Sequence, residues 1–253
     1  MLSRINDITT KFRLFKFFLL NIERFSTTPP YASREDSELP CGALNRSDML
    51  NLAFKFIYGN LIEGDYFEFG CWTGRTFRMA YNCTRYPYYR GNTPYHSPIH
   101  LWAFDSFKGL PSIKQIDEDK KWKEGDFFTS AKEFIDILKS HHIPDDSYSV
   151  VEGFYEDSLT KELQNRILER TRAAVIYVDC DLYESTKTVL NFVKPLLQNG
   201  TVICFDDYYC FKGRPDKGEQ LAIKEFLENS RDLSFVDYYN FGWHGKSFII
   251  SCS

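Results

Sequence analysis

The stretch Asp65-Tyr-Phe-Glu68-Phe-Gly70-Cys-Trp-Thr-Gly74-Arg75 decides the fold, because it reads as a strand, a glycine turn and the start of a helix. The two glycines would let the backbone turn tightly and approach a ligand, and the free N–H groups of the following helix would face the same crevice. A dinucleotide fingerprint reads G-x-G-x-x-G, whereas this turn reads G-x-x-x-G after Glu68. The pattern favours a site for an adenosine with a cationic amino-acid tail over a pyrophosphate cradle. An ordinary strand-turn-helix junction is the alternative.

The composition is that of one α/β domain with additions. The chain has 253 residues, of which 43% are hydrophobic and 17% aromatic, so a large core can be buried. A net charge of −4 and a pI near 5.8 offer no electrostatic footprint for nucleic acid. Seven scattered cysteines without a C-x-x-C pair indicate neither a disulfide framework nor a zinc site, so a reducing cytoplasm is the simplest compartment.

Residues 1–45 are predicted to form an N-terminal helical extension that acts as a lid or an interface. Apolar residues at helical spacing over residues 11–25 predict an amphipathic helix whose apolar run is too short for stable membrane insertion. A position on a membrane surface is the alternative to packing on the domain or on a second copy in a homo-oligomer. Residues 26–40 are rich in Ser, Thr, Pro and charge, which is typical of a loop.

Strands and helices alternate along residues 46–253, which predicts an α/β fold with a doubly wound, mostly parallel, seven-stranded sheet. The strands are expected near residues 65–69, 100–104, 148–152, 173–178, 201–205, 234–240 and 246–251. The last two must form an antiparallel hairpin, because a parallel crossover needs about a dozen residues. The intervening helices include one over residues 156–171. Residues 82–99 are read as an irregular insertion and residues 112–128 as a flap.

Acidic residues follow several strands, and the carboxyl ends of parallel strands share the ligand-binding edge of a sheet. They are Glu68, Asp105, Asp179, Asp181, Asp206 and Asp207. Asp105 could accept both hydroxyls of a ribose, with a turn cap as the alternative. The other four acids form two doublets whose charges repel, so a cation must compensate them. Hard oxygen ligands suit Mg²⁺ or Ca²⁺, although a single acid in such a loop is more often a helix cap.

The motifs of the chain resemble those of the class I S-adenosylmethionine-dependent methyltransferases, and within them the macrocin O-methyltransferase family, which methylates sugar hydroxyls. The resemblance rests on E-F-G-C-W-T-G from Glu68, F-D-S-F-K-G-L-P from Phe104, D-C-D-L-Y-E-S-T from Asp179 and F-D-D-Y from Phe205. It covers roughly residues 40–250, so residues 46–253 are expected to be the S-adenosylmethionine-binding domain.

The resemblance also implies roles for individual residues. Glu68, Gly70 and Gly74 would line the methionine and ribose portion of S-adenosylmethionine. Asp105 and Ser106 would hold its ribose and adenine edge, and Gly153 and Phe154 would flank the adenine. Asp179 or Asp181, together with Asp206 and Asp207, would hold Mg²⁺. Which of Asp179 and Asp181 is a ligand and which is the general base stays open.

The activity that the resemblance implies is Mg²⁺-dependent methyl transfer to a hydroxyl of a sugar or sugar-containing natural product. The metal would lower the pKa of the hydroxyl, and an Asp would take its proton. A nucleotide-dependent oxidoreductase is disfavoured by the G-x-x-x-G spacing. A non-catalytic cofactor-binding module is disfavoured because all four acids of the doublets are present. Trp72, Trp102 and Trp243 are expected in the core.

Overall fold

The computed structural model describes residues 44–85, 89–90, 93–94, 98–119 and 121–253. Leu44–Ser253 forms one compact unit. The predicted helix over residues 11–25 and the predicted loop over residues 26–40 lie outside the described residues, and the domain boundary after residue 45 stays a prediction. Every helix within the described ranges is too short or too polar to cross a membrane.

The described chain opens with helix α3 (Arg46–Asn60), whose start is fixed by a capping box. The Asn45 side chain accepts from the Asp48 N–H at 2.9 Å, and the Asp48 carboxylate accepts from the Asn45 N–H at 3.1 Å. Leu61 ends the helix in the left-handed conformation, with φ of 60°. Because the cap sets where α3 begins, Arg46 occupies the first helical position.

Seven strands form one mixed sheet with the order β5-β4-β1-β6-β7-β9-β8, which confirms the predicted fold class. They are β1 (Asp65–Phe69), β4 (Leu101–Asp105), β5 (Tyr148–Glu152), β6 (Ala173–Val178), β7 (Val202–Phe205), β8 (Leu233–Phe241) and β9 (Gly245–Cys252). The first five pair in parallel, whereas β9 runs antiparallel to both β7 and β8. The chain reverses its direction of winding at β1, between β4 and β6, and open α/β sheets bind ligands at such a point.

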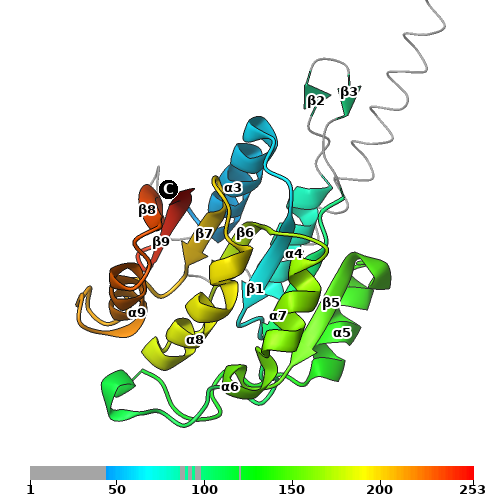
Figure 1. The fold of residues 1–253 in the computed structure, drawn as a ribbon. Coiled ribbons are helices and arrows are strands. Elements are labelled where there is room, and N and C mark those ends of the chain that lie inside the picture. Colours follow the sequence, from blue (N-terminus) through cyan, green and yellow to red (C-terminus); the bar gives the residue numbers. More distant parts are fainter. Residues whose placement is uncertain (1–43, 86–88, 91–92, 95–97, 120) are drawn as a thin grey trace, which may run out of the picture. The chain divides into compact units, whose positions relative to one another are not determined.

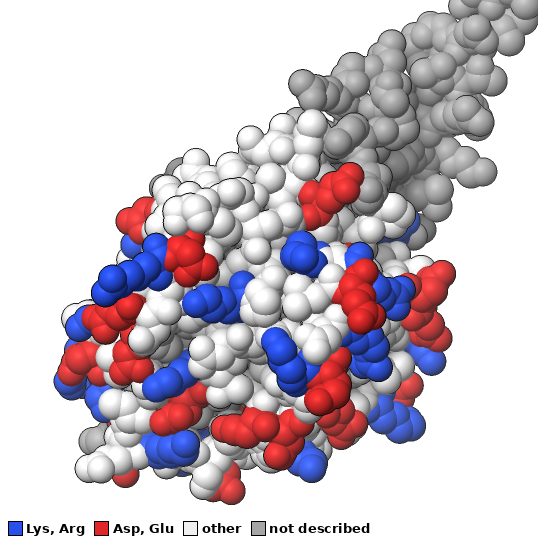
Figure 2. Space-filling view, viewed as in Figure 1, with Lys and Arg blue, Asp and Glu red and all other residues white. Residues whose placement is uncertain are grey.

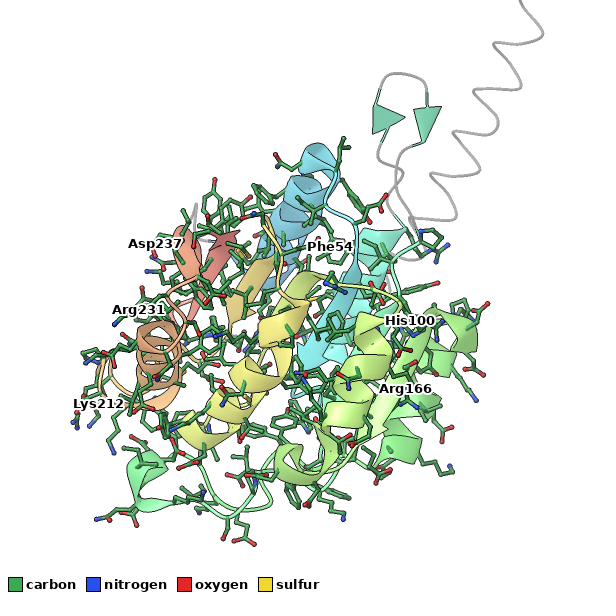
Figure 3. All side chains as sticks on the ribbon, viewed as in Figure 1. Phe54, His100, Arg166, Lys212, Arg231 and Asp237 are labelled. Carbon is green, nitrogen blue, oxygen red and sulfur yellow. The ribbon has the colours of Figure 1, made fainter. Side chains whose placement is uncertain are left out.

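Helices cover both faces of the sheet (Figure 1). They are α4 (Arg75–Thr84), α5 (Ala131–Ser140), α6 (Tyr155–Ser158), α7 (Lys161–Leu168), α8 (Tyr183–Val193) and α9 (Gly218–Glu228), with short 3-10 turns η1 (Gln115–Asp117), η2 (Asp145–Ser147) and η3 (Lys194–Leu196). One apolar core joins α3, α4 and α5 to the sheet, and the other joins α7, α8 and α9 to its opposite face. Figure 3 shows the side chains of both layers, with Phe54 inside and Arg166, Lys212 and Arg231 at the periphery.

The structure departs from the predictions at three places. The single helix expected over residues 156–171 is two helices, because Thr160 caps α7 by accepting the Leu163 N–H at 3.2 Å. The insertion contains a short antiparallel pair, β2 (Tyr89–Arg90) and β3 (Thr93–Pro94). Trp102 is buried as predicted, but the prediction of a core position was wrong for the other two tryptophans, since Trp72 is 49% and Trp243 63% exposed.

The surface of the described unit mixes charges of both signs. Figure 2 shows lysines and arginines interspersed with aspartates and glutamates over the face in view.

Candidate functional site

The glycine turn after β1 packs directly against the segment after β6. Gly70 has φ of +87°, and a Cβ placed on it would lie 1.7 Å from the Asp179 carbonyl oxygen, so only glycine fits. Gly74 has φ of +68° and stands at the N-cap of α4, where no side chain caps the helix. The turn thus brings the start of α4, whose N-cap residue has no side chain, to the point where β1 and β6 end.

Glu68 is a buried acid at the centre of this turn. Its side chain is 0% exposed and accepts a hydrogen bond from the Tyr66 hydroxyl. The other carboxylate oxygen, Oε1, makes no hydrogen bond within the described part of the chain. Burial raises the pKa of Glu68 to about 8, against the hydrogen bond from Tyr66, which lowers it. An unsatisfied buried oxygen is costly, so this position suits a donor supplied by a ligand or by water.

Asp105 ties the glycine turn to the end of β4. Its carboxylate accepts the backbone N–H groups of Cys71 at 2.7 Å, Trp72 at 3.0 Å and Phe107 at 2.7 Å. The Ser106 hydroxyl donates to the Gly109 carbonyl at 2.7 Å. Since a carboxylate has about four acceptor positions, Asp105 has room for about one more donor rather than for both ribose hydroxyls. Its first role in the structure is to shape the turn.

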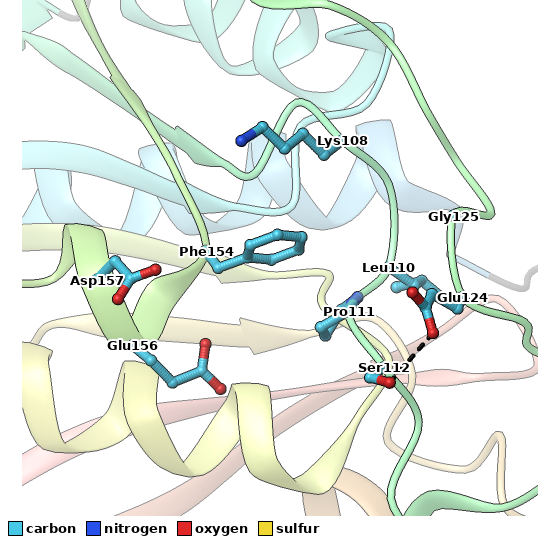
Figure 4. A pocket seen from close by; sticks show the side chains of 9 residues that line it. All are labelled: Lys108, Leu110, Pro111, Ser112, Glu124, Gly125, Phe154, Glu156 and Asp157. Carbon is cyan, nitrogen blue, oxygen red and sulfur yellow. Dashed lines mark hydrogen bonds between the residues drawn. The ribbon is translucent and has the colours of Figure 1, made fainter.

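A cavity of about 440 Å³ lies beside the ends of β4 and β5 (Figure 4). It is lined by Lys108, Leu110, Pro111, Ser112, Glu124, Gly125, Phe154, Glu156 and Asp157. The Gly153 N–H donates to the Asp105 carbonyl at 3.0 Å, which joins the loop after β5 to the loop after β4. Phe154 lines this cavity with a flat aromatic ring.

The acids after β6 and β7 converge, as the topology predicted. Asp179, Asp206 and Asp207 each offer a carboxylate oxygen, and these oxygens lie within 4.8 Å of one another. Asp207 Oδ2 is buried and has no hydrogen-bond partner among the described residues. Burial, followed by the neighbouring negative charges, raises the pKa values of Asp179 and Asp207 well above the usual range. Three hard oxygens, one of them unsatisfied, fit a divalent cation.

Arg46 compensates the third acid of this cluster. Its guanidinium forms a bidentate pair with the carboxylate of Asp206, through Nε at 2.8 Å and through Nη2. The Tyr177 hydroxyl donates to the same carboxylate at 2.5 Å, and His244 Nδ1 lies 2.6 Å from the Asp206 backbone oxygen. Although burial acts to raise it, the hydrogen bonds and charge of Arg46 lower the pKa of Asp206. The uncompensated charge of the cluster thus rests on Asp179 and Asp207.

Asp181 lies beside this group rather than within it. Its Oδ1 accepts a hydrogen bond from Trp122 Nε1 at 2.6 Å, and its backbone has φ of +60°. Burial, and next the charge of Asp179, raise the pKa of Asp181 to about 7, against the Trp122 hydrogen bond, which lowers it. A carboxylate with a pKa near neutrality is suited to accept a proton at physiological pH.

Residues that the sequence analysis missed complete the site. Glu219 of α9 is 1% exposed, and its Oε2 accepts the Asp207 N–H at 3.1 Å. Arg46, which follows the cap of α3, contacts Asp206. Trp122, which lies in the flap, contacts Asp181. Both residues are far from these acids in the sequence. No local pattern in the sequence marks Arg46 and Glu219, whereas Trp122 lies in the predicted flap and only its contact with Asp181 was missed.

A mostly parallel sheet with a glycine turn after β1, an acid at the end of β4 and a carboxylate cluster after β6 and β7 is the architecture of Rossmann-like methyltransferases. A profile of the macrocin O-methyltransferase family (TylF) matches residues 42–238. The chain therefore belongs to the macrocin O-methyltransferase family, which confirms the predicted family and the predicted enzyme class.

Similar proteins agree with this assignment. A Streptomyces olivaceus 8-demethyl-8-(2,3-dimethoxy-alpha-L-rhamnosyl)-tetracenomycin-C 4'-O-methyltransferase is 26% identical over 171 residues, which are 65% of this chain and 60% of that relative. A Streptomyces niveus demethyldecarbamoylnovobiocin O-methyltransferase is 24% identical over 196 residues, 73% of this chain and 70% of the relative. The crystal structure of the calicheamicin methyltransferase CalS11 superposes with a TM-score of 0.62 at 22% identity, covering 91% of this chain and 90% of that one. This last likeness concerns the fold.

Proposed function

We propose that the chain transfers a methyl group from S-adenosylmethionine to a hydroxyl of a sugar or a sugar-containing natural product, with the help of a divalent cation. The observation that carries the proposal is the contact between the glycine turn and the acidic cluster, since the backbone of Gly70 touches that of Asp179. A cofactor seated on the turn would place its methyl end beside the carboxylates. The acceptor class is supported by the first relative, whose name specifies 4'-O-methylation of a tetracenomycin that carries a rhamnosyl unit.

Four groups of residues would hold the cofactor. The uncapped N-terminus of α4 and the free oxygen of Glu68 suit the charged methionine end, which carries both an ammonium and a carboxylate. Asp105 and Ser106 shape the ribose position, and Gly153 and Phe154 border the cavity in which an adenine would lie. S-adenosylmethionine supplies an electrophilic methyl group when bound. The protein has to orient it and exclude water.

The acids divide into ligands and base. Asp179, Asp206 and Asp207 would hold Mg²⁺, which supplies positive charge that favours the ionised form of a neighbouring hydroxyl. Arg46 orients Asp206, so that the cluster keeps its shape when no metal is bound. Asp181 lies outside the trio and would accept the proton of the acceptor hydroxyl as its oxygen attacks. This division proposes Asp179 as the ligand and Asp181 as the base, where the sequence left both roles open.

Methyl transfer from labelled S-adenosylmethionine to a panel of rhamnosides and other deoxyhexosides tests the proposal. We expect transfer with Mg²⁺, loss in EDTA and recovery when Mg²⁺ is restored. Asp207→Asn keeps the shape but removes a charged ligand, so its activity should recover partly at high Mg²⁺, whereas Asp181→Asn should stay inactive. Full transfer in excess EDTA would contradict the metal role. A protein that binds S-adenosylhomocysteine but transfers to no hydroxyl acceptor would favour the non-catalytic alternative.

A further inference from the structure

The flap, of which residues 112–119 and 121–128 are described, reaches the start of α8 and caps it. Asp117 is 1% exposed and accepts the N–H groups of Tyr183 at 2.7 Å and Glu184 at 3.4 Å. The N-cap residue of α8 is Leu182, which has no side-chain acceptor. Asp117 therefore supplies, from 66 positions away, the cap that a helix normally takes from its own N-cap residue.

The same flap also holds the acid that precedes α8. Trp122 is 7% exposed, donates to Asp181 Oδ1 and packs against Phe211 with ring centroids 4.7 Å apart. Asp181 adopts φ of +60°, and the Leu182 N–H donates to the Cys180 carbonyl at 2.6 Å, so the turn is tight. A non-glycine residue rarely adopts this conformation, and it persists only when surrounding contacts fix it.

Two lysines fasten the flap on its other side, to the segment after β7. Lys121 Nζ donates to the Cys210 carbonyl at 2.5 Å, and Lys217 Nζ donates to the Ile116 carbonyl at 2.5 Å. The flap thus contacts both the segment that follows β6 and the segment that follows β7. The flap contacts the turn at Asp181 in two ways. Trp122 donates a hydrogen bond to the Asp181 side chain, and Asp117 caps the helix that follows the turn.

We propose that Trp122 and Asp117 are positioning residues, which hold the strained turn so that the Asp181 carboxylate faces the acceptor hydroxyl. The inference rests on the proposed role of Asp181 as the base. Trp122 donates to Oδ1 of Asp181 and thereby fixes the direction of the carboxylate. Its donor is neutral, so it orients the acid without cancelling its charge, in contrast to the guanidinium on Asp206.

The chain contains a matched control for this contact. Trp102 is 8% exposed, and its Nε1 donates to Asp65 Oδ2 at 2.9 Å, at the amino end of β1 and away from the site. Trp122→Phe and Trp102→Phe each keep an aromatic ring and remove one buried hydrogen bond from tryptophan to aspartate. Asp117→Ala removes the distant cap of α8, whereas Asp117→Asn retains a residue that caps helices well.

Hydrogen exchange of the backbone amides of residues 181–186, measured on the S-adenosylhomocysteine complex, needs no acceptor. We expect Trp122→Phe and Asp117→Ala to speed this exchange and Trp102→Phe to leave it unchanged. Asp117→Asn should speed it less than Asp117→Ala, because one amide oxygen can still accept the Tyr183 N–H but not the Glu184 N–H as well. In turnover with methyl α-L-rhamnoside, Trp122→Phe should lower kcat about tenfold or more, with KM and the affinity for S-adenosylhomocysteine nearly unchanged. Trp102→Phe should retain the wild-type kcat.

The outcomes separate this inference from the proposed function. Exchange at residues 181–186 that stays at the wild-type rate in both Trp122→Phe and Asp117→Ala would overturn the inference. So would a wild-type kcat for Trp122→Phe when Asp181→Asn is inactive. If Asp181→Asn itself turned over normally, the base assignment within the proposed function would be wrong, and the inference would fall with it even if exchange were faster.

Discussion

The ion pair between Arg46 and Asp206 allows a quantitative test of how the acidic cluster is held together. Arg46→Met keeps the length of the side chain and removes the guanidinium. Asp206 is 1% exposed and Arg46 22% exposed, so the variant leaves a carboxylate in the interior beside two other acids. Removing one partner of a buried ion pair costs about 3–5 kcal/mol. The remaining hydrogen bond from Tyr177 favours the lower end, about 3 kcal/mol.

The pH dependence of this loss has a definite sign. Burial acts to raise the pKa of Asp206, but Arg46 lowers it. A depressed folded pKa stabilises the native state above the unfolded value of about 4, and this contribution disappears as the pH falls through the folded pKa. The difference between wild type and Arg46→Met should therefore be full at pH 7 and shrink in acid.

Urea unfolding at pH 7 in EDTA measures the effect, and a second arginine provides the control. Arg214 pairs with Asp216 in the same bidentate manner, through Nε at 2.9 Å and through Nη2, but both side chains are exposed. Arg214→Met should change the free energy of unfolding very little, because exposed pairs contribute little. If Arg46→Met were no more destabilising than Arg214→Met, Arg46 would not be the cation that compensates the cluster.

The remaining predictions concern the pH profile and the cofactor turn. Burial raises the pKa of Glu68 to about 8 and that of Asp181 to about 7, so between about pH 4 and 8 the native state binds more protons than the unfolded state. The Tm of the metal-free protein should therefore decrease as the pH is raised from about 4 to 8. A Tm that does not change over this range would count against these buried acids. The rate of turnover with Mg²⁺ should increase with pH, with a midpoint at or below about pH 7, because Asp181 must lose its proton to act as the base. A rate that does not depend on pH would exclude Asp181 as the base. Glu68→Ala and Asp105→Ala should each weaken S-adenosylhomocysteine binding by about 1–3 kcal/mol in calorimetry, and wild-type affinity in either variant would refute its role. Gly70→Ala should abolish that binding, because its Cβ would lie 1.7 Å from a backbone oxygen; retained binding would show that the turn can rearrange.

The sheet and the acidic edge could be predicted because their signals are local. The strand of Ala173–Val178 is a continuous apolar run and is buried at every position, so its pattern left little choice. Parallel topology then brings strand ends together whatever the distance in sequence. The convergence of Asp179 with Asp206 and Asp207 followed from the order of strands alone.

The contacts that refine the site could not be predicted, because they depend on long-range packing. Arg46 meets Asp206 across 160 positions, and Trp122 meets Asp181 across 59. The flap has no hydrophobic period that would place Trp122. Trp72 was wrongly expected in the core because the prediction considered only the hydrophobicity of its side chain. The backbone of Trp72 has φ of +42° in the glycine turn, and its ring remains exposed.

Calorimetric titration with S-adenosylhomocysteine and, separately, with NAD tests the central claim most directly, because it depends on no acceptor. The geometry of the glycine turn, with the uncapped start of α4 and the free oxygen of Glu68, predicts saturable binding of one S-adenosylhomocysteine per chain and no response to NAD. Saturable binding of NAD without any binding of S-adenosylhomocysteine would contradict the account.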